Sequence, residues 1–251
     1  MKIKKILLTG SSGKLGKAIA NSGQFPPLLK PSRDMLDITN PKTIREYFSE
    51  NDFDAVIHCA ALARMKECQE DPEKAVQTNL IGTGNLVIEV LKKEKKLQEK
   101  IRFLHVSTDG VYPGIKGDYS ENDAASPYNK YGWTKLGAEC AVKLLSNYCI
   151  IRTAFFDPDN IRFNKSATDA FSSKVPINYL VEAIATILNH NFIGTINIGS
   201  ERKSDYEIYK EFKLSLQPCR FKDVAEEAKI PLAKDSSMNS SIWKKIEKET
   251  K

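Results

Sequence analysis

A tyrosine and a lysine four residues apart could carry out acid–base chemistry in this chain of 251 residues. Tyr131 and Lys135 share one face of a helix if residues 127–146 are helical, as their apolar spacing indicates. A phenol has an unperturbed pKa near ~10, and a neighbouring ammonium favours the phenolate, so the phenol becomes a better acid near neutral pH. The pair predicts a proton donor, and the same lysine could hydrogen-bond a ribose hydroxyl of a cofactor.

Position distinguishes this pair from others with the same spacing. Tyr131 alone lies in the helix that follows a strand ending at Thr108. Ligands of open α/β sheets bind at the carboxyl ends of the strands, where the Thr108 hydroxyl could hold a substrate carbonyl oxygen beside the phenol. Without Tyr131, Thr108 would be interpreted as a residue that completes a turn. The other pairs are predicted to be surface residues: Tyr112 and Lys116, Tyr206 and Lys210, Tyr209 and Lys213.

A glycine-rich turn near the start of the chain predicts a dinucleotide site. An apolar run over residues 3–8 ends at Thr9 and is followed by Gly10-x-x-Gly13-x-x-Gly16 and a helical pattern. Such a turn lets backbone N–H groups approach a pyrophosphate, and the helix N-terminus adds a partial positive charge. The spacing differs from the commoner Gly-x-Gly-x-x-Gly and also fits an ordinary strand-to-helix turn. Its place at the first strand favours the cofactor interpretation.

Strand and helix patterns alternate along the chain. Strands are expected at 3–8, 28–29, 55–57, 101–106, 149–153 and 195–198, and helices near 14–20, 41–48, 71–93, 127–146 and 179–188. This alternation predicts an α/β fold, a Rossmann-type doubly wound parallel sheet with helices on both faces. Residues 1–156, completed by 176–200, are expected to form the NAD(P)-binding domain. Residues 157–175 and 201–251, with short helical pieces near 206–212 and 224–228, are expected to form a small substrate-binding lobe.

The composition limits the classes of partner. The chain is 41% hydrophobic, and its 38 Lys and Arg against 32 Asp and Glu give a net charge of +6. This balance suits an anionic ligand, but the charges are mixed, so we expect no nucleic-acid binding. Five cysteines without a Cys-x-x-Cys motif, and three dispersed histidines, predict no metal site and a reduced, cytoplasmic protein. No signal peptide or membrane span is expected, because the first apolar run is short.

Together these motifs resemble the extended short-chain dehydrogenases/reductases. Within that family the chain is most similar to the dTDP-4-dehydrorhamnose reductases, which reduce a 4-keto sugar nucleotide. The resemblance covers about residues 1–156 and depends on Gly10-x-x-Gly13-Lys14-Leu15-Gly16, Leu36-Asp37-Ile38-Thr39, Cys59-Ala60-Ala61, Asn79, Ser107-Thr108-Asp109-Gly110-Val111-Tyr112, Ser126-Pro127-Tyr128-Asn129-Lys130-Tyr131-Gly132-x-x-Lys135 and Arg152-Thr153.

The resemblance implies roles for these residues. Thr108, Tyr131 and Lys135 would form a catalytic trio, with Tyr131 giving its proton to the alkoxide as hydride reaches C4 of the sugar. Asn79 would order a helix behind the site, and Asp37-Ile38 would lie against the adenine. The implied cofactor contacts are Gly10, Ser12, Gly13, Lys14, Leu15, Gly16, Ser32, Arg33, Asp37, Ile38, Cys59, Ala60, Ala61, Asn79, Tyr131 and Lys135. The implied substrate contacts are Met65, Thr108, Asp109, Val111, Tyr112, Arg162 and Lys165, the last two toward a diphosphate.

Two positions refine the expected reaction. Related dehydratases have Thr-Asp-Glu at the strand end, where an Asp–Glu pair eliminates water. Gly110 stands at the third position here, so the pair for elimination is missing and a dehydratase is disfavoured. NAD-binding members carry an acid after the second strand. Ser32 takes that place, between Lys30 and Arg33, and suits a 2′-phosphate better, so NADP(H) is favoured over NAD(H), although Arg33 could also only cover the surface.

Other functions stay open. A regulatory partner of methionine adenosyltransferase resembles the same reductases, so the chain could be a non-catalytic NADP-binding subunit, although the complete trio favours catalysis. An epimerase or epimerase–reductase would need a second acid–base pair, which the sequence does not show. The nucleotide and the sugar stay undefined, because Arg64-Met65-Lys66-Glu67 stands where the reductases usually have an Asp-Lys pair. Helices near 72–93 and 127–146 pair in relatives, which makes a homodimer an expectation.

Overall fold

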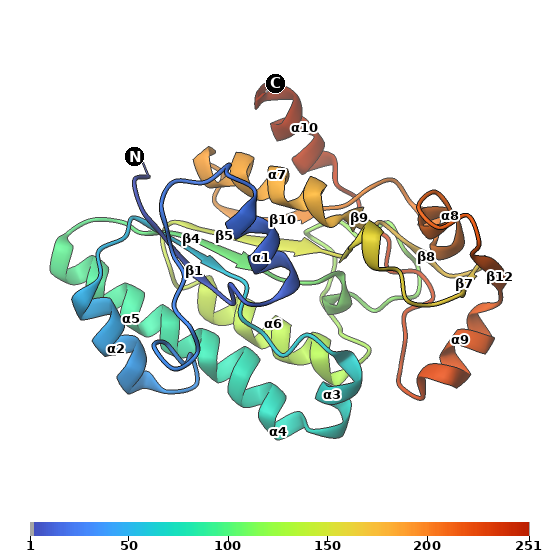
Figure 1. Cartoon of the computed structure of the whole chain (residues 1–251), viewed down its shortest axis with the longest axis horizontal. Helices are drawn as coiled ribbons and strands as arrows, with labels where there is room; N and C mark the ends of the chain where they lie inside the picture. Colours follow the sequence, from blue (N-terminus) through green and yellow to red (C-terminus); the bar gives the residue numbers. More distant parts are fainter. Residues whose placement is uncertain (1–2, 251) are drawn as a thin grey trace.

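A six-stranded parallel sheet forms the centre of the computed structural model, which describes residues 3–250 (Figure 1). The strand order is β10-β5-β4-β3-β1-β2. The strands are β1 (Ile6–Thr9), β2 (Leu28–Leu29), β3 (Ala55–His58), β4 (Arg102–Val106), β5 (Tyr148–Thr153) and β10 (Gly194–Ile198). Helices cover both faces, so the inner strands are continuous apolar runs, as is typical of parallel sheets. The predicted doubly wound α/β fold is confirmed.

Two layers of helices cover the sheet (Figure 1). One layer contains α1 (Lys14–Asn21), α7 (Ile177–Asn189) and α10 (Ser241–Thr250), and the other contains α2 (Pro41–Glu50), α5 (Gly82–Leu97) and α6 (Lys130–Val142). The three helices of the first layer share one apolar core with the sheet, to which they contribute Ile19, Ile184 and Trp243. Ile44 and Leu86 belong to the core under the second layer. Trp243 lies on α10, a helix that the sequence analysis did not predict, and its buried indole fixes that helix on the sheet side.

The direction of winding changes at β1. From β1 the chain passes to β2 on one side and then crosses to β3 on the other side of β1. The carboxyl ends of β1 and β3 therefore diverge into a topological switch point, where open α/β sheets bind their ligands. Thr9 and His58 end these two strands, and they are paired in the sheet register.

The helix expected at 71–93 is interrupted, which corrects that prediction. It consists of α4 (Pro72–Ala75), a π-helical segment η1 (Val76–Ile81) and α5. The side chain of Asn79 bonds to groups outside the helix, and the Thr83 hydroxyl donates to the Asn79 carbonyl at 2.6 Å. These bonds favour the wider turn, and such π segments often occur at functional sites.

Two further helix boundaries differ from the sequence analysis. The residues after Ala61, for which no helix is predicted from the sequence, form the helix α3 (Met65–Glu70). The helix expected from Pro127 begins at Lys130, because the Asn129 side chain caps it by accepting from the Gly132 backbone N–H at 2.9 Å. Asp109–Val111 forms the short 3₁₀ turn η2 after β4.

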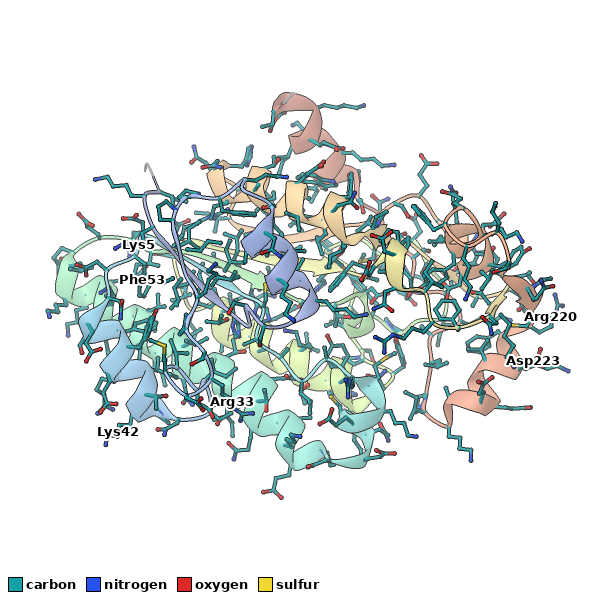
Figure 2. All side chains as sticks on the ribbon, in the orientation of Figure 1. Lys5, Arg33, Lys42, Phe53, Arg220 and Asp223 are labelled. Carbon is teal, nitrogen blue, oxygen red and sulfur yellow. The ribbon has the colours of Figure 1, made fainter. Side chains whose placement is uncertain are left out.

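The remaining residues form a small lobe of short elements at one end of the molecule. Three two-stranded sheets pair β6 (Phe155–Phe156) with β9 (Val175–Pro176), β7 (Lys165–Ala167) with β12 (Gln217–Cys219), and β8 (Phe171–Ser172) with β11 (Lys203–Ser204). The 3₁₀ turn η3 (Pro158–Asn160) and the helices α8 (Asp205–Lys210) and α9 (Phe221–Ala228) complete the lobe. In Figure 2, Arg220 and Asp223 lie in this lobe, at the opposite end of the molecule from Lys5 and Lys42.

Within residues 3–250, no helix is both long enough and apolar enough to span a membrane.

Candidate active site

The glycine-rich turn between β1 and α1 is packed so tightly that two of its positions exclude a side chain. Gly10 has φ 71°, and a Cβ there would lie 2.5 Å from the backbone nitrogen of Ala60. A Cβ on Gly16 would lie 2.2 Å from the Gly10 carbonyl oxygen. Gly10 therefore permits the turn, and Gly16 permits α1 to approach it. These are the tasks that glycines perform in turns that bind a pyrophosphate.

A cavity of about 260 Å³ opens over this turn at the switch point. Nine of the predicted cofactor residues line it: Gly10, Ser12, Gly13, Arg33, Asp37, Ile38, Cys59, Ala60 and Ala61. Thr9, Ser11, Pro31, Leu36, Thr39 and Thr78 complete the lining. Lys14, Leu15 and Gly16 belong to the first turn of α1, and Ser32 is exposed on the loop after β2, so these four do not line the cavity. The predicted contacts Tyr131 and Lys135 on α6 do not line it either.

Arg33 and Asp37 fix the outer wall of this cavity. Arg33 Nε donates to Asp37 Oδ2 at 3.0 Å. Asp37 Oδ1 accepts from the backbone N–H and the hydroxyl of Thr39 at 2.9 and 2.8 Å. The carboxylate thus closes a tight turn, while most of the Arg33 side chain stays exposed. The cavity shape and the glycines fit a dinucleotide, and the Arg33 guanidinium adds a cation at its rim.

Tyr131 and Thr108 meet because α6 packs directly on the turn η2. A Cβ on Gly132 would lie 2.2 Å from the Gly110 carbonyl oxygen, so only glycine allows this approach. The Thr108 side chain lies close enough to the Tyr131 phenol to oppose part of the rise in its pKa. Thr108 Oγ1 also accepts from the Gly110 N–H at 3.0 Å and donates to Asp109 Oδ1 at 3.1 Å. Thr108 therefore completes a turn and lies close to the phenol at the same time.

The electrostatics of Tyr131 differ from the expectation. Burial raises the pKa of the phenol well above its usual value, and the nearby Asp109 carboxylate raises it further. The prediction that a neighbouring ammonium lowers this pKa is wrong for the protein in this state. The Lys135 ammonium is held elsewhere, and desolvation is the larger effect. Tyr131 is consequently a neutral phenol at neutral pH.

Lys135 is buried against the end of β4. Its Nζ donates to the Val106 carbonyl at 2.9 Å and lies 3.2 Å from His105 Nε2. Burial lowers the pKa of Lys135 to about 8 and the pKa of His105 well below its usual value. An ammonium can only donate, so His105 Nε2 accepts and the ring proton belongs on Nδ1. The Lys135 charge also acts on the Cys59 thiol, which lines the cavity.

Asn79 joins three elements behind the site. Its Oδ1 accepts from the Leu62 N–H at 2.7 Å, and its Nδ2 donates to the Leu62 carbonyl at 3.1 Å and to Thr134 Oγ1 at 2.9 Å. These bonds tie η1 to the segment after β3 and to α6. The amide is buried and both of its polar atoms are bonded, while its role in ordering the site stays a prediction. The Asn79 side chain does not line the cavity, so the structure does not support its predicted direct contact with the cofactor.

A second group of polar side chains surrounds Asp109. Asp109 Oδ2 accepts from Ser236 Oγ at 2.7 Å. Burial raises the pKa of Asp109, while Ser236 and the Lys174 ammonium oppose that shift. Lys174 is itself paired with Asp205 at 2.5 Å. The sequence analysis missed Ser236, Lys174 and Asp205, because they lie in segments without periodicity and only the fold of the lobe brings them together.

Two predicted substrate residues have buried side chains. Val111 and Tyr112 are fully buried. The Tyr112 hydroxyl donates to Asn197 Oδ1 at 2.9 Å and accepts from Arg152 at 2.9 Å, and Arg152 forms a buried ion pair with Glu139 at 2.7 Å. Tyr112 is therefore part of a polar core network, which corrects its prediction both as a surface residue and as a substrate contact.

The other predicted substrate residues are dispersed. Met65 is half-buried and accepts from Asn129 Nδ2 at 3.4 Å, next to the start of α6. Lys165 is paired with Glu227 at 2.8 Å in the lobe. Arg162 is exposed and bonded to its neighbour Asn160. Of these three residues, Met65 contacts the cap of α6, the helix that carries Tyr131, while the contacts given for Lys165 and Arg162 lie within the lobe.

The parallel sheet and the glycine turn at its switch point place the chain in the class of Rossmann-type α/β proteins. Residues 4–167 match the family model described as RmlD substrate binding domain, and the chain belongs to this family.

Curated proteins match part of the chain in sequence. It is 30% identical over 156 residues to dTDP-4-dehydrorhamnose reductase of Mycolicibacterium smegmatis, covering 60% of this chain and 45% of that protein. It is 28% identical over 148 residues to methionine adenosyltransferase 2 subunit beta of Rattus norvegicus, covering 55% and 42%. The chain thus spans less than half the length of these curated relatives.

Several solved structures resemble nearly the whole chain, among them one that contains NADP. It is dTDP-4-dehydrorhamnose reductase from Bacillus anthracis in complex with NADP, which superposes with a TM-score of 0.84 at 22% identity. The superposition covers 97% of this chain and 92% of that one, so the likeness in fold extends into the small lobe.

Proposed function

We propose that the protein reduces a 4-keto-6-deoxy sugar nucleotide with NADPH, as the dTDP-4-dehydrorhamnose reductases do. The observation that carries this proposal is the buried, protonated Tyr131 phenol close to Thr108, in a fold whose glycine turn lines a cavity at the switch point. Gly110 adjoins this pair in place of the carboxylate that an elimination would need. The relatives named as reductases of this kind support the same reaction.

The residues would divide the work as follows. Bound NADPH supplies the hydride. The Thr108 hydroxyl turns from Asp109 to the substrate carbonyl oxygen and orients it toward Tyr131. Tyr131 gives its proton to that oxygen as negative charge develops there, which is general acid catalysis by a group that starts protonated. Lys135 moves from the Val106 carbonyl toward the ribose and stabilises the phenolate that Tyr131 leaves behind.

NADP(H) is the cofactor that the rim of the cavity favours. The loop after β2 offers the exposed Arg33 and the hydroxyl of Ser32 where NAD-binding members carry an acid. A guanidinium binds a phosphate dianion through charge-assisted hydrogen bonds. The solved Bacillus anthracis relative, which contains NADP, supports this choice.

The remaining features concern the substrate, the assembly and the compartment. We assign residues 157–175 and 201–251 to a lobe that binds the sugar nucleotide, because Lys174, Asp205 and Ser236 of this part surround Asp109. We also propose a cytoplasmic homodimer. All five cysteines are free thiols, which suits a reducing compartment.

Turnover on a panel of nucleotide sugars tests the proposal. Purified protein should oxidise NADPH when a 4-keto-6-deoxyhexose is supplied on dTDP, UDP or GDP, and the preferred nucleotide should raise the melting temperature most. NADPH binding without turnover on any of these sugars would contradict the reductase. It would favour a regulatory subunit, the role named in the methionine adenosyltransferase relative, and co-purification with a larger enzyme would then be the matching result.

A further inference from the structure

A second, larger hollow continues from the cofactor cavity toward α4. Its volume is about 490 Å³, and it is lined by Arg33, Thr39, Asp71, Glu73, Lys74, Gln77 and Thr78. Arg33, Thr39 and Thr78 also line the cavity over the glycine turn. The two hollows therefore form one groove, with the glycine turn at one end and α4 at the other.

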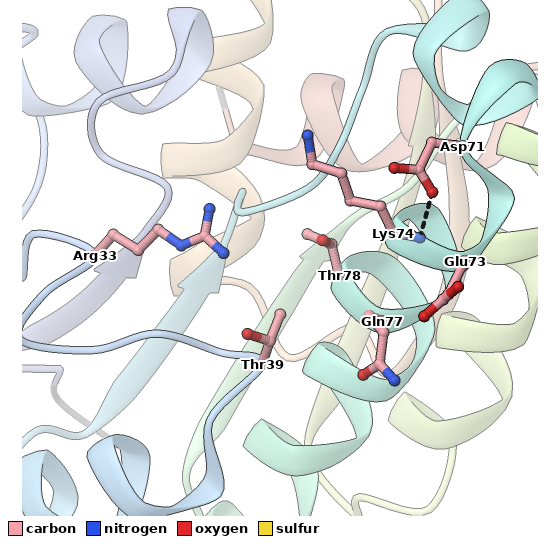
Figure 3. Close-up of a pocket in the computed structure, with 7 residues that line it drawn as sticks. All are labelled: Arg33, Thr39, Asp71, Glu73, Lys74, Gln77 and Thr78. Atoms are coloured by element: carbon pink, nitrogen blue, oxygen red, sulfur yellow. Dashed lines mark hydrogen bonds between the residues drawn. The ribbon is translucent and has the colours of Figure 1, made fainter.

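Two cations reach into this outer hollow from opposite sides. Figure 3 shows Arg33 extending from the loop after β2, with Lys74 of α4 on the other side of the pocket. Lys74 Nζ is 2.7 Å from Glu67 Oε1, and both side chains remain partly exposed. The Glu67 carboxylate raises the pKa of Lys74, while the Arg33 charge acts in the opposite direction, so the two cations are within electrostatic reach of each other.

The acids of this hollow leave the space between the cations open. Asp71 Oδ1 accepts from the backbone N–H of Lys74 at 3.0 Å, so this carboxylate caps α4 (Figure 3). Asp37 holds Arg33 through Nε, which leaves the two terminal guanidinium nitrogens free to donate to a ligand. Glu73 also lines the hollow, and Figure 3 shows its carboxylate on the side of Gln77, away from Lys74 Nζ. A compact dianion between Arg33 and Lys74 would reduce the repulsion between them.

We propose that Lys74 and Arg33 clamp the 2′-phosphate of NADP from opposite sides of the groove. This inference rests on the proposed function, because it assumes that the adenosine half of a dinucleotide lies in the groove. On binding, Lys74 exchanges the carboxylate of Glu67 for the phosphate. Lys74 is thus a determinant of cofactor choice on α4, remote in sequence from the loop that carries Ser32 and Arg33.

Calorimetric titration of the full chain with NADP⁺ and NAD⁺ tests the clamp without any turnover. The two ligands differ only in the 2′-phosphate. Lys74→Gln should weaken NADP⁺ binding by about tenfold, the loss expected for one hydrogen bond to a charged group, and should leave NAD⁺ binding unchanged. Lys66→Gln is the matched control, because Lys66 is an exposed lysine on the neighbouring α3, paired with Glu70 at 3.8 Å, and it should change neither affinity.

Glu67→Gln provides a second test with the opposite sign. It removes the carboxylate that competes for Lys74 and should strengthen NADP⁺ binding without affecting NAD⁺. The clamp is wrong if Lys74→Gln leaves NADP⁺ affinity intact, if it weakens both cofactors equally, or if Glu67→Gln weakens NADP⁺ binding. Wild-type protein that binds neither cofactor would instead refute the proposed function.

Discussion

At the scale of single residues, the proton donor is protonated but not yet activated, because a raised pKa makes the Tyr131 phenol a weaker acid. Tyr131 has a raised pKa because it is buried next to Asp109, so it holds its proton at neutral pH. A reductase needs this starting state, since its general acid must be protonated when the alkoxide forms. The Lys135 ammonium is hydrogen-bonded to the Val106 carbonyl and to His105 instead of approaching Tyr131. Its movement toward the ribose would supply the positive charge that the sequence spacing suggested.

The pH dependence of cofactor binding should report on Lys135. Burial lowers the pKa of this ammonium to about 8, so the cation is present below that pH and lost above it. NADPH affinity measured by fluorescence titration should therefore fall as the pH rises through about 8. Lys135→Met should bind weakly at every pH and show no such step. A wild-type affinity that is constant between pH 7 and 9 would exclude this role for Lys135.

At the scale of elements, the site depends on helices that approach turns closely. Gly16 brings α1 onto the glycine turn, and Gly132 brings α6 onto η2. Asn79 then fixes η1 against both the segment after β3 and α6. These contacts hold α1, α6 and η1 in place around the cavity and the Tyr131–Thr108 pair. A substitution at any of the three residues should therefore affect cofactor binding as well as the stability of the protein.

Gly16→Ala should disrupt the turn. Its Cβ would lie 2.2 Å from the Gly10 carbonyl oxygen, which the backbone can relieve only by moving α1 away. We expect a lower melting temperature and loss of measurable NADP⁺ binding in calorimetry. Gly84→Ala is the matched control in α5, where a Cβ meets nothing within 4 Å, and it should stabilise the helix by about 1 kcal/mol. Normal cofactor binding by Gly16→Ala would show that the turn tolerates a side chain.

Asn79→Leu should destabilise the protein by about 1–3 kcal/mol, because the partly buried Leu62 N–H loses its acceptor and the Leu62 carbonyl keeps only the weak Cys68 Sγ donor. Urea denaturation measures the free energy of unfolding directly. Asn189→Ala is the control, since its amide bonds only one carbonyl of its own helix at the surface, and its effect should stay below about 1 kcal/mol. If the two substitutions lowered the free energy of unfolding equally, the bonds of Asn79 to Leu62 and Thr134 would not stabilise the protein as expected.

At the scale of the whole molecule, one helical face lacks a cover. Leu80, Ile88 and Leu91 form an exposed stripe on η1 and α5. Trp133 and Leu144 are exposed on α6 and just after it, and Gly137 of α6 packs against Leu80. The two helices lie side by side on the same face of the sheet (Figure 1). Exposed apolar stripes on adjacent helices are typical of an interface between subunits, which supports the proposed homodimer.

Ile88→Glu should convert this homodimer into a monomer. The substitution places a charge in the centre of the apolar stripe, and desolvating it opposes association. Light scattering coupled to size-exclusion chromatography gives the mass directly. Leu214→Glu is the matched control, because Leu214 is equally apolar and more exposed but lies in the small lobe. A wild-type protein that is monomeric at high micromolar concentration would remove the basis for the interface.

The sequence predicts the sheet better than it predicts the site. Alternating apolar runs are local signals, so every strand of the main sheet and the glycine turn could be located. The π segment at Asn79 could not, because it arises from bonds to Leu62 and Thr134, far away in the chain. The resting position of Lys135 and the group around Asp109 are likewise products of packing. Helical spacing placed Tyr131 and Lys135 on one face, but burial decided their pKa values.

The most direct test of the central claim follows the hydride into the sugar. Wild-type protein supplied with NADPH that carries deuterium at both C4 positions of the nicotinamide, and with a 4-keto-6-deoxyhexose nucleotide, should yield a hydroxy sugar with one deuterium at C4, as mass spectrometry would detect. Tyr131→Phe should keep its NADPH affinity and lose about 10²- to 10⁴-fold in rate. A sugar without deuterium, or transfer by Tyr131→Phe at the wild-type rate, would contradict the account.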